Sequence, residues 1–516
     1  MNNSRKLILN TVLLTAAAFV MRTVDVSYNV FLTNRIGAAG IGLFQLTLTV
    51  YTMAVTFACA GVRFGATRLN IDLLSKDPLA SLRKPMLMCL GWALAVSTVV
   101  AIALYHAAPV IAELWLHDIR TEPSLRLLAL GLPMVSLTAA MTGYFTAVRT
   151  VYKSALTQGF EHAIKIACVI FFLGRMLPRG LEYAALAIVY GMVIGQAAAL
   201  LLACVLLWKS RYIQRKARLN DKVKLHSLLR IAGPEAAGAC ARSVLLTTEH
   251  LLIPRGFQAS GRSNEEAMRI YGVVQGMTLP VLLYPSAVLS SLAALLVPEF
   301  SQLRVQGKKE QINTSVSKVL KLALLYGLFA GGMFYAFATP LSQAIYGNTD
   351  AAKYLQLLAP LVPIMYLDMS VDGMLKGLDQ QKASMMYNIL DSALCVVLVY
   401  LLLPRLAIKG YIIVLFVSEL YNFFFSIRRL LKVTQAPRPT LQSVVEPVLC
   451  VAAAAMIPLA LSKALLPQAL NSVAGLVIAM SLSAVIYFSS LRITGCIKKE
   501  DLRAISLRYM LLRFRK

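Results

Sequence analysis

The chain has 516 residues, of which 58% are hydrophobic and 15% are charged, and its 51 Lys and Arg against 24 Asp and Glu give a net charge of +27. Soluble domains carry about 25% charged residues, so this composition excludes a soluble enzyme, a secreted disulfide scaffold and a disordered chain. The basic residues stand between long apolar runs, so their excess does not indicate nucleic-acid binding.

Apolar runs long enough to cross a membrane follow one another along the chain. A spanning helix needs about 20 mainly apolar residues. Six such stretches come first, at 7–32, 40–62, 85–106, 125–147, 157–177 and 183–208. Eight more follow a polar stretch, at 231–253, 270–297, 319–341, 355–376, 383–403, 408–430, 443–465 and 470–491. We therefore predict an all-α polytopic membrane protein with about 14 transmembrane helices.

The basic residues indicate the orientation of these spans. With the N-terminus inside the cell, 36 of the 51 Lys and Arg residues fall on the inner face, 11 on outer connections and four within spans. Inner loops of membrane proteins carry an excess of Lys and Arg. The pattern predicts a multi-pass protein of the cytoplasmic membrane with both termini in the cytoplasm.

The sequence repeats itself at an offset of 230 residues. The informative coincidences are Gly42 with Gly272, Gln45 with Gln275, Pro133 with Pro363, Gly143 with Gly373, and Glu161 with Asp391. The register holds without a gap, so spans 1–6 and 7–12 are predicted to be two copies of one six-helix unit. Two such bundles around a central cleft are the architecture of an alternating-access carrier.

This repeat divides the chain into five predicted parts. They are an N-terminal six-helix bundle at 1–208, a basic cytoplasmic linker at 209–230, a C-terminal bundle at 231–431, two appended helices at 432–492 and a basic cytoplasmic tail at 493–516. Pro133 and Pro363 are predicted to kink equivalent spans, because proline inside a helix removes a hydrogen bond. They are hinge candidates, although kinks also serve packing alone. Span 8 is interrupted in the same way by Pro280 and Pro285.

Several charged residues fall inside predicted spans, where each costs about 2.5–3.5 kcal/mol and needs a reason. They include Arg22 and Asp25 three residues apart, Glu161 and Lys165 four apart, Arg242 and Glu249 seven apart, and Asp368 and Asp372 four apart. Such spacings place each pair on one face of a helix. The pairs are either internal salt bridges that fix helix packing or groups that line a wet cavity.

Arginine binds phosphate through a planar fork and stays charged when it is desolvated. Arg22 and Arg242 are therefore candidates for binding the phosphates of an anionic headgroup. The candidates for coupling or for lining the cavity are Asp25, Glu161, Lys165, Glu249, Asp368 and Asp372. The sequence has no glycine-rich nucleotide-binding motif, and its Cys and His residues lack metal-ligand spacing, so we expect no cofactor, no metal and no catalytic residue.

Local motifs resemble a known family. They are Gly143-Tyr144-Phe145, then Gln158, Glu161 and Lys165, together with Arg35-Ile36-Gly37, Leu296-Val297-Pro298-Glu299-Phe300-Ser301 and Lys376-Gly377-Leu378. With the two repeats, they resemble the multidrug/oligosaccharidyl-lipid/polysaccharide flippase superfamily, and within it the stage V sporulation protein B group of polysaccharide-biosynthesis membrane proteins. Two positions depart from the related patterns: Tyr28 stands where the lipid II flippases have a second arginine, and Asp379 where the group usually has glycine.

The resemblance implies a flippase for a lipid-linked saccharide, such as a peptidoglycan precursor on undecaprenyl pyrophosphate, moved from the inner to the outer leaflet. It implies that Arg22 corresponds to the first-span arginine of the related lipid II flippases. The partners expected are this substrate, membrane lipids and cell-wall synthesis enzymes, with no nucleic acid, and the role is in envelope synthesis or sporulation.

Two other functions stay open at this point. A cation-coupled multidrug exporter of the same superfamily would use Asp25 as its coupling site. A membrane glycosyltransferase or polysaccharide polymerase would need acidic or His catalytic groups on a sizeable outer loop. The only substantial outer connection, at about 107–124, is short, so the sequence favours a transporter over an enzyme.

Overall fold

The computed structural model describes residues 2–59, 61–77, 81–214, 225–434, 445–454 and 472–496. These residues form helices, turns and short connections, and no strand occurs among them. Nine helices in this part of the chain are long and apolar enough to cross a membrane. The prediction of an all-α polytopic membrane protein is confirmed, whereas the number of fourteen spans stays a prediction. Parts of the predicted linker, appended helices and tail lie outside the described residues.

Two of the nine helices each cover two predicted spans. Helix α1 (Asn2–Cys59) has a non-helical backbone at Gly37, where φ is 73°. Helix α16 (Gln381–Thr434) has one at Ala407, where φ is 48°. Both breaks fall between predicted spans, so the polar interruptions of the sequence correspond to sharp changes of helix direction.

The helices form two compact units, which we describe separately. Unit 1 contains residues 1–39 and 256–516, and unit 2 contains residues 40–255. The chain passes from one unit to the other after Ala39 and again after Arg255. The first predicted span of each half therefore belongs to the unit that is built mainly from the other half. The two predicted six-helix bundles, with limits at 208 and 231, stay a prediction.

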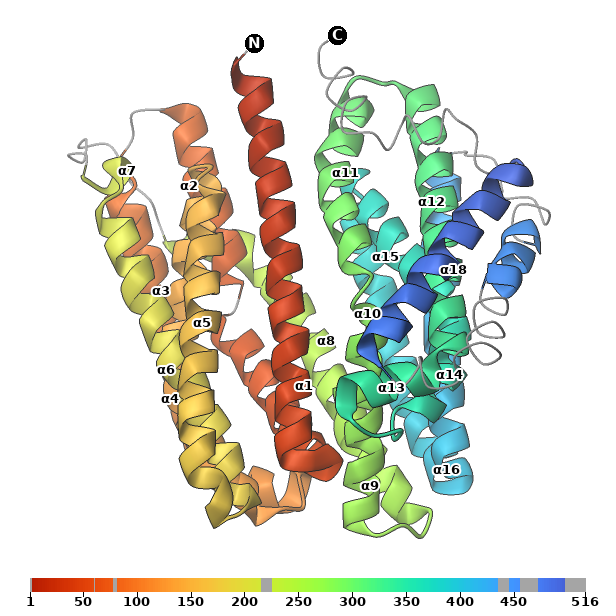
Figure 1. Cartoon of the computed structure of the whole chain (residues 1–516). Coiled ribbons are helices and arrows are strands. Elements are labelled where there is room, and N and C mark those ends of the chain that lie inside the picture. The colour runs from red at the N-terminus through yellow and green to blue at the C-terminus, as the bar shows by residue number, and fades with distance from the viewer. Residues whose placement is uncertain are drawn as a thin grey trace. The chain divides into compact units, whose positions relative to one another are not determined.

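Unit 2 consists mainly of long helices that pack against one another. Besides the second part of α1 and most of α8 (Leu225–Ala259), its elements are α2 (Val62–Lys76), α3 (Arg83–Val110), η1 (Ile111–Trp115), η2 (Ile119–Thr121), α4 (Glu122–Ala147), α5 (Val151–Met176), η3 (Leu177–Arg179), α6 (Leu181–Trp208) and α7 (Arg211–Gln214). Helix α5 packs along α6, and α4 packs against α2, α3 and α6 (Figure 1). Met86, Tyr144 and Phe145 are buried in its core.

Unit 1 combines the first part of α1 with the C-terminal half of the chain. Its further elements are α9 (Asn264–Tyr271), η4 (Gly272–Thr278), α10 (Leu279–Leu283), α11 (Ala287–Val305), α12 (Lys309–Ala336), α13 (Ala338–Tyr346), α14 (Ala352–Leu358), η5 (Ala359–Leu361), α15 (Val362–Gly377), α16 and α18 (Val473–Ile493), and residues 445–454 are also helical. Helix α15 packs against α11, α12 and α16. Phe300, Val316 and Met374 are buried where these helices meet.

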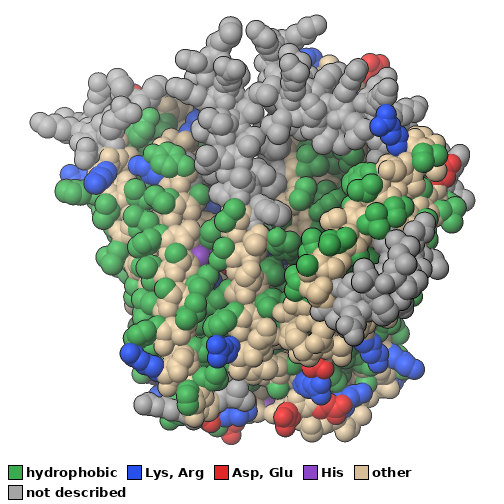
Figure 2. Space-filling model, viewed as in Figure 1, with side chains coloured by type: hydrophobic (Ala, Val, Ile, Leu, Met, Phe, Trp, Pro, Cys, Tyr) green, Lys and Arg blue, Asp and Glu red, His purple; other side chains and the backbone are tan. Residues whose placement is uncertain are grey.

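Hydrophobic side chains cover the middle of the helices that are visible in Figure 2, and charged side chains lie mainly near helix ends. Many large apolar side chains are exposed, such as Leu201, Tyr400 and Ile478. Exposure of this kind is expected where the surrounding solvent is lipid, since lipid tails are as apolar as Leu.

Glycines bring helices of each unit into close contact at positions 230 residues apart. A β-carbon on Gly143 of α4 would overlap the carbonyl oxygen of Arg63 in α2. A β-carbon on Gly373 of α15 would lie 2.6 Å from Cβ of Ala293 in α11. Residues 63 and 293 are also 230 positions apart, so both partners of the contact recur at the offset of the sequence repeat.

Candidate functional site

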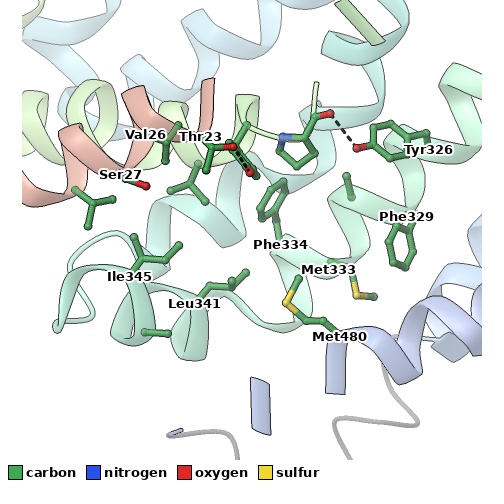
Figure 3. A pocket seen from close by; sticks show the side chains of 16 residues that line it. Thr23, Val26, Ser27, Tyr326, Phe329, Met333, Phe334, Leu341, Ile345 and Met480 are labelled. Carbon is green, nitrogen blue, oxygen red and sulfur yellow. Dashed lines mark hydrogen bonds between the residues drawn. The ribbon is translucent and has the colours of Figure 1, made fainter. Parts of the chain in front are cut away.

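Unit 1 contains a cavity of about 660 Å³, which lies within the size range of small-molecule sites (Figure 3). Its walls come from α1, from the segment around α10, and from α12, α13 and α18. Of its sixteen lining residues, only Thr23, Ser27, Tyr284 and Tyr326 carry hydroxyl groups, and the others are apolar. The cavity therefore suits a mainly apolar ligand.

Helix α1 contributes a single face to this cavity. Thr23, Val26, Ser27 and Val30 follow the spacing that places residues on one side of a helix. The hydroxyl groups of Thr23 and Tyr284 lie 3.0 Å apart and form a hydrogen bond across the cavity wall (Figure 3). The sequence did not identify this cavity, because its walls come from segments that are far apart along the chain.

Arg22 and Asp25 lie on the same part of α1. Arg22 is exposed and Asp25 is partly buried. Arg22 directly precedes Thr23 of the cavity lining, but Arg22 itself does not line the cavity. Its role as a phosphate ligand stays a prediction.

Arg242 and Glu249 lie on the part of α8 that belongs to unit 2. Arg242 is exposed, and Glu249 is partly buried. Between them, the Thr247 hydroxyl donates to the Thr49 carbonyl oxygen at 3.5 Å, which holds α8 against the second part of α1. Because Arg22 belongs to unit 1 and Arg242 to unit 2, their joint binding of one headgroup stays a prediction.

Glu161 and Lys165 lie on one face of α5 and are both partly buried. Nζ of Lys165 is 3.1 Å from Nδ1 of His162. The backbone of α6 approaches this face closely, because a β-carbon on Gly195 would lie 3.0 Å from the Glu161 carbonyl oxygen and 3.1 Å from Lys165 Cβ. The structure therefore brings these two residues together at a tight helix contact, a position that suits packing as well as transport.

Asp372 belongs to a polar network between α15 and α16. Its carboxylate accepts a hydrogen bond from the Ser384 hydroxyl and pairs with Lys376 Nζ at 2.6 Å. Nearby on α16, the Ser418 hydroxyl donates to Asp391 at 2.8 Å. Sequence reasoning named the acidic residues and missed their serine partners, although Ser384 and Asp391 share one face of α16 by spacing.

Asp368 lies one turn before Asp372 on α15. Its Oδ2 accepts a hydrogen bond from Asn422 Nδ2 at 3.2 Å. The Asp368 carboxylate also interacts with the Ser426 side chain, and the amide oxygen of Asn422 is buried and accepts no hydrogen bond among the described residues. A buried carboxylate whose partners here, Asn422 and Ser426, are neutral has the chemistry to take up a proton or a small cation. No group of three His, Cys, Asp or Glu side chains that would hold a metal ion occurs in the described part of the chain.

The two hinge candidates have different surroundings. Pro133 lies inside α4, as predicted. Pro363 lies in the first turn of α15, after the short helix η5, where proline replaces no helical hydrogen bond. Its backbone fits against α12, because a β-carbon on Gly327 would lie 2.8 Å from Pro363 Cα. Pro363 therefore marks the start of α15 after η5 and packs against α12. A hinge role for either proline stays a prediction.

The comparisons with known proteins agree with this architecture. The family model described as polysaccharide biosynthesis protein matches residues 7–304, more than half of the chain. The chain belongs to this family. A second model, MatE, matches residues 261–401 of this polysaccharide biosynthesis family member.

Curated relatives match most of this family member. Stage V sporulation protein B of Bacillus subtilis (strain 168) is 25% identical over 407 residues, which cover 78% of this chain and 79% of that protein. Lipid II flippase MurJ of the same organism is 20% identical over 462 residues, which cover 83% of each. The resemblance to the stage V sporulation protein B group of the flippase superfamily is therefore confirmed.

Solved structures share the fold of this polysaccharide biosynthesis family member. Lipid II flippase MurJ in an inward closed conformation matches with a TM-score of 0.69 and 12% identity, over 94% of this chain and 98% of that one. An inward-facing multidrug resistance MATE family transporter matches with a TM-score of 0.63 and 13% identity, over 81% and 96%. The chain is thus a multi-pass membrane protein of a superfamily of transporters and flippases.

Proposed function

We propose that this protein flips a lipid-linked saccharide, such as an undecaprenyl-pyrophosphate-linked peptidoglycan or polysaccharide precursor, across the cytoplasmic membrane by alternating access. The observation that carries the proposal is the apolar cavity of unit 1, whose lining on α1 begins at Thr23, the residue that follows Arg22. An apolar chain joined to a charged headgroup is the class of ligand that this combination suits. The lipid II flippase MurJ, which matches along most of the chain, supports the same substrate class.

The two parts of such a substrate would have different partners. The isoprenoid chain would occupy the cavity and the lipid beside it. There, its contacts with lipid tails would be replaced by contacts with the apolar side chains of the cavity. Arg22, and Arg242 in unit 2, would neutralise the pyrophosphate, because guanidinium groups bind phosphate oxygens in a bidentate manner. No bond of the substrate is broken in this process, so the protein requires no catalytic group.

Transport against a gradient also needs a source of energy. Asp368, with Asn422 as its partner, is the strongest coupling candidate, since its carboxylate is buried and bonded to the neutral side chains of Asn422 and Ser426. Asp25, Glu161, Lys165, Glu249 and Asp372 remain coupling or cavity candidates. The membrane potential would add about 2.3 kcal/mol per elementary charge per 100 mV.

A multidrug exporter is the second function to be tested. The MatE model matches only residues 261–401, whereas the sporulation protein and the lipid II flippase match most of the chain. The arginines at 22 and 242 also suit an anionic headgroup better than an organic cation. These observations favour the lipid-linked substrate.

The test is transport by the purified protein in vesicles that contain defined undecaprenyl-pyrophosphate saccharides. We expect the wild-type protein to move the saccharide to the opposite leaflet, and the Arg22→Glu/Arg242→Glu double variant to lose this activity. Arg428→Glu is the matched control, because Arg428 is exposed on α16. Normal flipping by the double variant would overturn the phosphate assignment. Transport of organic cations in place of the lipid would favour the exporter.

A further inference from the structure

Two connections of unit 2 are fastened to each other at one end of its helices. The turn between α4 and α5 contains Arg149, and Lys209 directly follows α6. Two hydrogen bonds join these connections: Tyr144 Oη with Ser210 Oγ at 2.6 Å, and Lys153 Nζ with the Leu206 carbonyl oxygen at 3.4 Å. The first bond lies on one side of Arg149 and Lys209 along the chain, and the second lies on the other side. The two basic residues therefore belong to the same end of unit 2.

These connections carry only basic charges. The sequence has no Asp or Glu in residues 123–160 or 183–220. Lys153 is partly buried, and its Nζ lies 5.7 Å from the centre of the Phe145 ring, so its charge is engaged within the protein. Arg149 and Lys209 are exposed, and neither pairs with an acidic side chain in the described part of the chain. Their charges are thus available to a ligand.

Arg149 has a backbone conformation that is unfavourable for arginine. Its φ is 56°, in the left-handed region where glycine is usual. Asp379, 230 positions later, has the same conformation but pairs with Arg304 at 2.9 Å. The residue of unit 2 that corresponds to Arg304 is Leu74, so Arg149 has no equivalent pair. The helix ending accepts either charge, and a ligand of opposite charge accounts for an arginine that is both strained and unpaired.

Aromatic and apolar side chains continue from the two basic residues along the spanning helices. Tyr152 of α5 is 59% exposed, and Trp208 of α6 is 73% exposed. Leu156 is exposed one turn further along α5, and Val205 and Leu201 are exposed one and two turns before Trp208. Tyr and Trp are enriched where the headgroups of a membrane meet its acyl chains. The two basic residues therefore lie at the level of the headgroups.

An anionic phospholipid matches both parts of this surface. We propose that Arg149 and Lys209 bind the phosphate of such a lipid, whose acyl chains lie along α5 and α6. Guanidinium groups suit phosphate oxygens, and basic pockets at the cytoplasmic ends of transmembrane helices bind anionic headgroups. The distribution of Lys and Arg predicts that this end faces the cytoplasm, so the lipid belongs to the inner leaflet. The site does not rest on the proposed function, because this phospholipid is a component of the membrane and is not transported.

Quenching of Trp208 fluorescence by brominated lipids tests the site without any saccharide lipid. The sequence has three tryptophans, so Trp92→Phe and Trp115→Phe leave Trp208 as the single fluorophore. This protein is reconstituted in phosphatidylcholine vesicles that contain either brominated phosphatidylglycerol or brominated phosphatidylcholine. We expect the anionic lipid to associate beside Trp208 more strongly than the zwitterionic lipid, by about fivefold for each of the two basic residues.

Substitutions at the two basic residues should reduce this preference. Arg149→Gly and Lys209→Gln are each expected to lower it about fivefold. Arg149→Asp, which gives unit 2 the residue found in unit 1, should lower it further. In the absence of anionic lipid, Arg149→Gly should also unfold at a higher temperature than the parent protein, because glycine adopts the left-handed conformation without strain. A purely structural role of Arg149 would not combine higher stability with weaker lipid binding.

The Lys309→Gln/Lys382→Gln double variant is the matched control. Both lysines are exposed in unit 1 on the predicted inner face, so the variant removes the same total charge at another place. It should leave the quenching of Trp208 unchanged. Equal quenching by the two lipids, or a full preference in the Arg149→Gly/Lys209→Gln double variant, would overturn the site. An equal fall in the control would also overturn it, because the effect would then follow the total charge of the protein.

Discussion

Arg149 and Asp379, which stand 230 positions apart, share a left-handed backbone conformation with φ of 56° and 62°. Each follows a helix that ends two residues earlier, α4 at Ala147 and α15 at Gly377. The next backbone N–H donates to a carbonyl five residues back in both places, at 2.8 Å. This is the hydrogen-bond pattern with which helices end on a left-handed residue, usually glycine. The same helix ending at both positions supports the internal repeat.

The left-handed conformation predicts the response of position 379 to substitution. A non-glycine residue pays about 1–2 kcal/mol there, and a β-branched residue pays more. The ion pair of Asp379 with Arg304, at 2.9 Å, offsets little of this cost, since the Asp379 side chain is 74% exposed. We expect Asp379→Gly to raise the thermal unfolding temperature of the purified protein and Asp379→Val to lower it. Asp379→Asn is the control for the charge, and a lower temperature for Asp379→Gly would contradict this account.

The close glycine contacts predict a second set of stability changes. Ala at Gly143 or Gly373 places a β-carbon too close to the Arg63 carbonyl oxygen or to Ala293 Cβ, so the two helices in contact have to shift apart. We expect each variant to lose about 1–3 kcal/mol of stability, measured by thermal unfolding in detergent. Gly91→Ala is the matched control, because a β-carbon on Gly91 meets nothing within 4 Å. Equal stability of all three variants would refute the contacts.

The cavity predicts a dependence on the length of the lipid chain. Ala344→Phe fills part of the cavity, since Ala344 lines it. We expect this variant to slow the flipping of a full-length undecaprenyl substrate by roughly tenfold, and to affect an analogue with a short isoprenoid chain much less. Ala452→Phe, at an exposed position of the helix 445–454, is the control. Equal loss for both substrates would show that the cavity does not hold the chain.

The buried oxygens of Asp368 and Asn422 predict the effect of removing the charge. Asp368→Asn loses the carboxylate that would take up a proton or a cation, and it leaves the side chain nearly the same size. We expect the variant to fold normally and to flip its substrate at a rate that no longer responds to imposed proton or sodium gradients. Asp379→Asn, at an exposed position, should respond as the wild type does. If Asp368→Asn keeps the full response, the coupling site lies elsewhere.

The fold was largely predictable from the sequence because a membrane permits few structures. Backbone groups in lipid have to be satisfied within the chain, so an apolar run of sufficient length is a helix. The charged residues of α1, α5 and α15 were found for a related reason, since a charge within an apolar run is conspicuous. The sequence repeat singled out Gly143 and Gly373, but it did not show that each of them contacts a neighbouring helix.

The rest of the site depends on which helices meet, and periodicity along one helix does not report this. Asn422 partners Asp368 across 54 residues of chain, and Tyr326 holds the carbonyl of Pro285 from another helix. The two prolines of the sequence repeat show that aligned residues can also differ in structure. Pro363 lies at the start of α15, after η5, whereas Pro133 lies inside α4. The same residue type at equivalent positions thus has two structural roles.

The passage of the chain between units after Ala39 also bears on how the protein is made. The hydrogen bond between Asn29 and Gly276 joins residues 247 positions apart. During synthesis, the first helix of the chain therefore enters the membrane long before its partners in unit 1 exist. Contacts between residues so distant in sequence form slowly. Assembly of unit 1 therefore has to wait until the second half of the chain has been inserted.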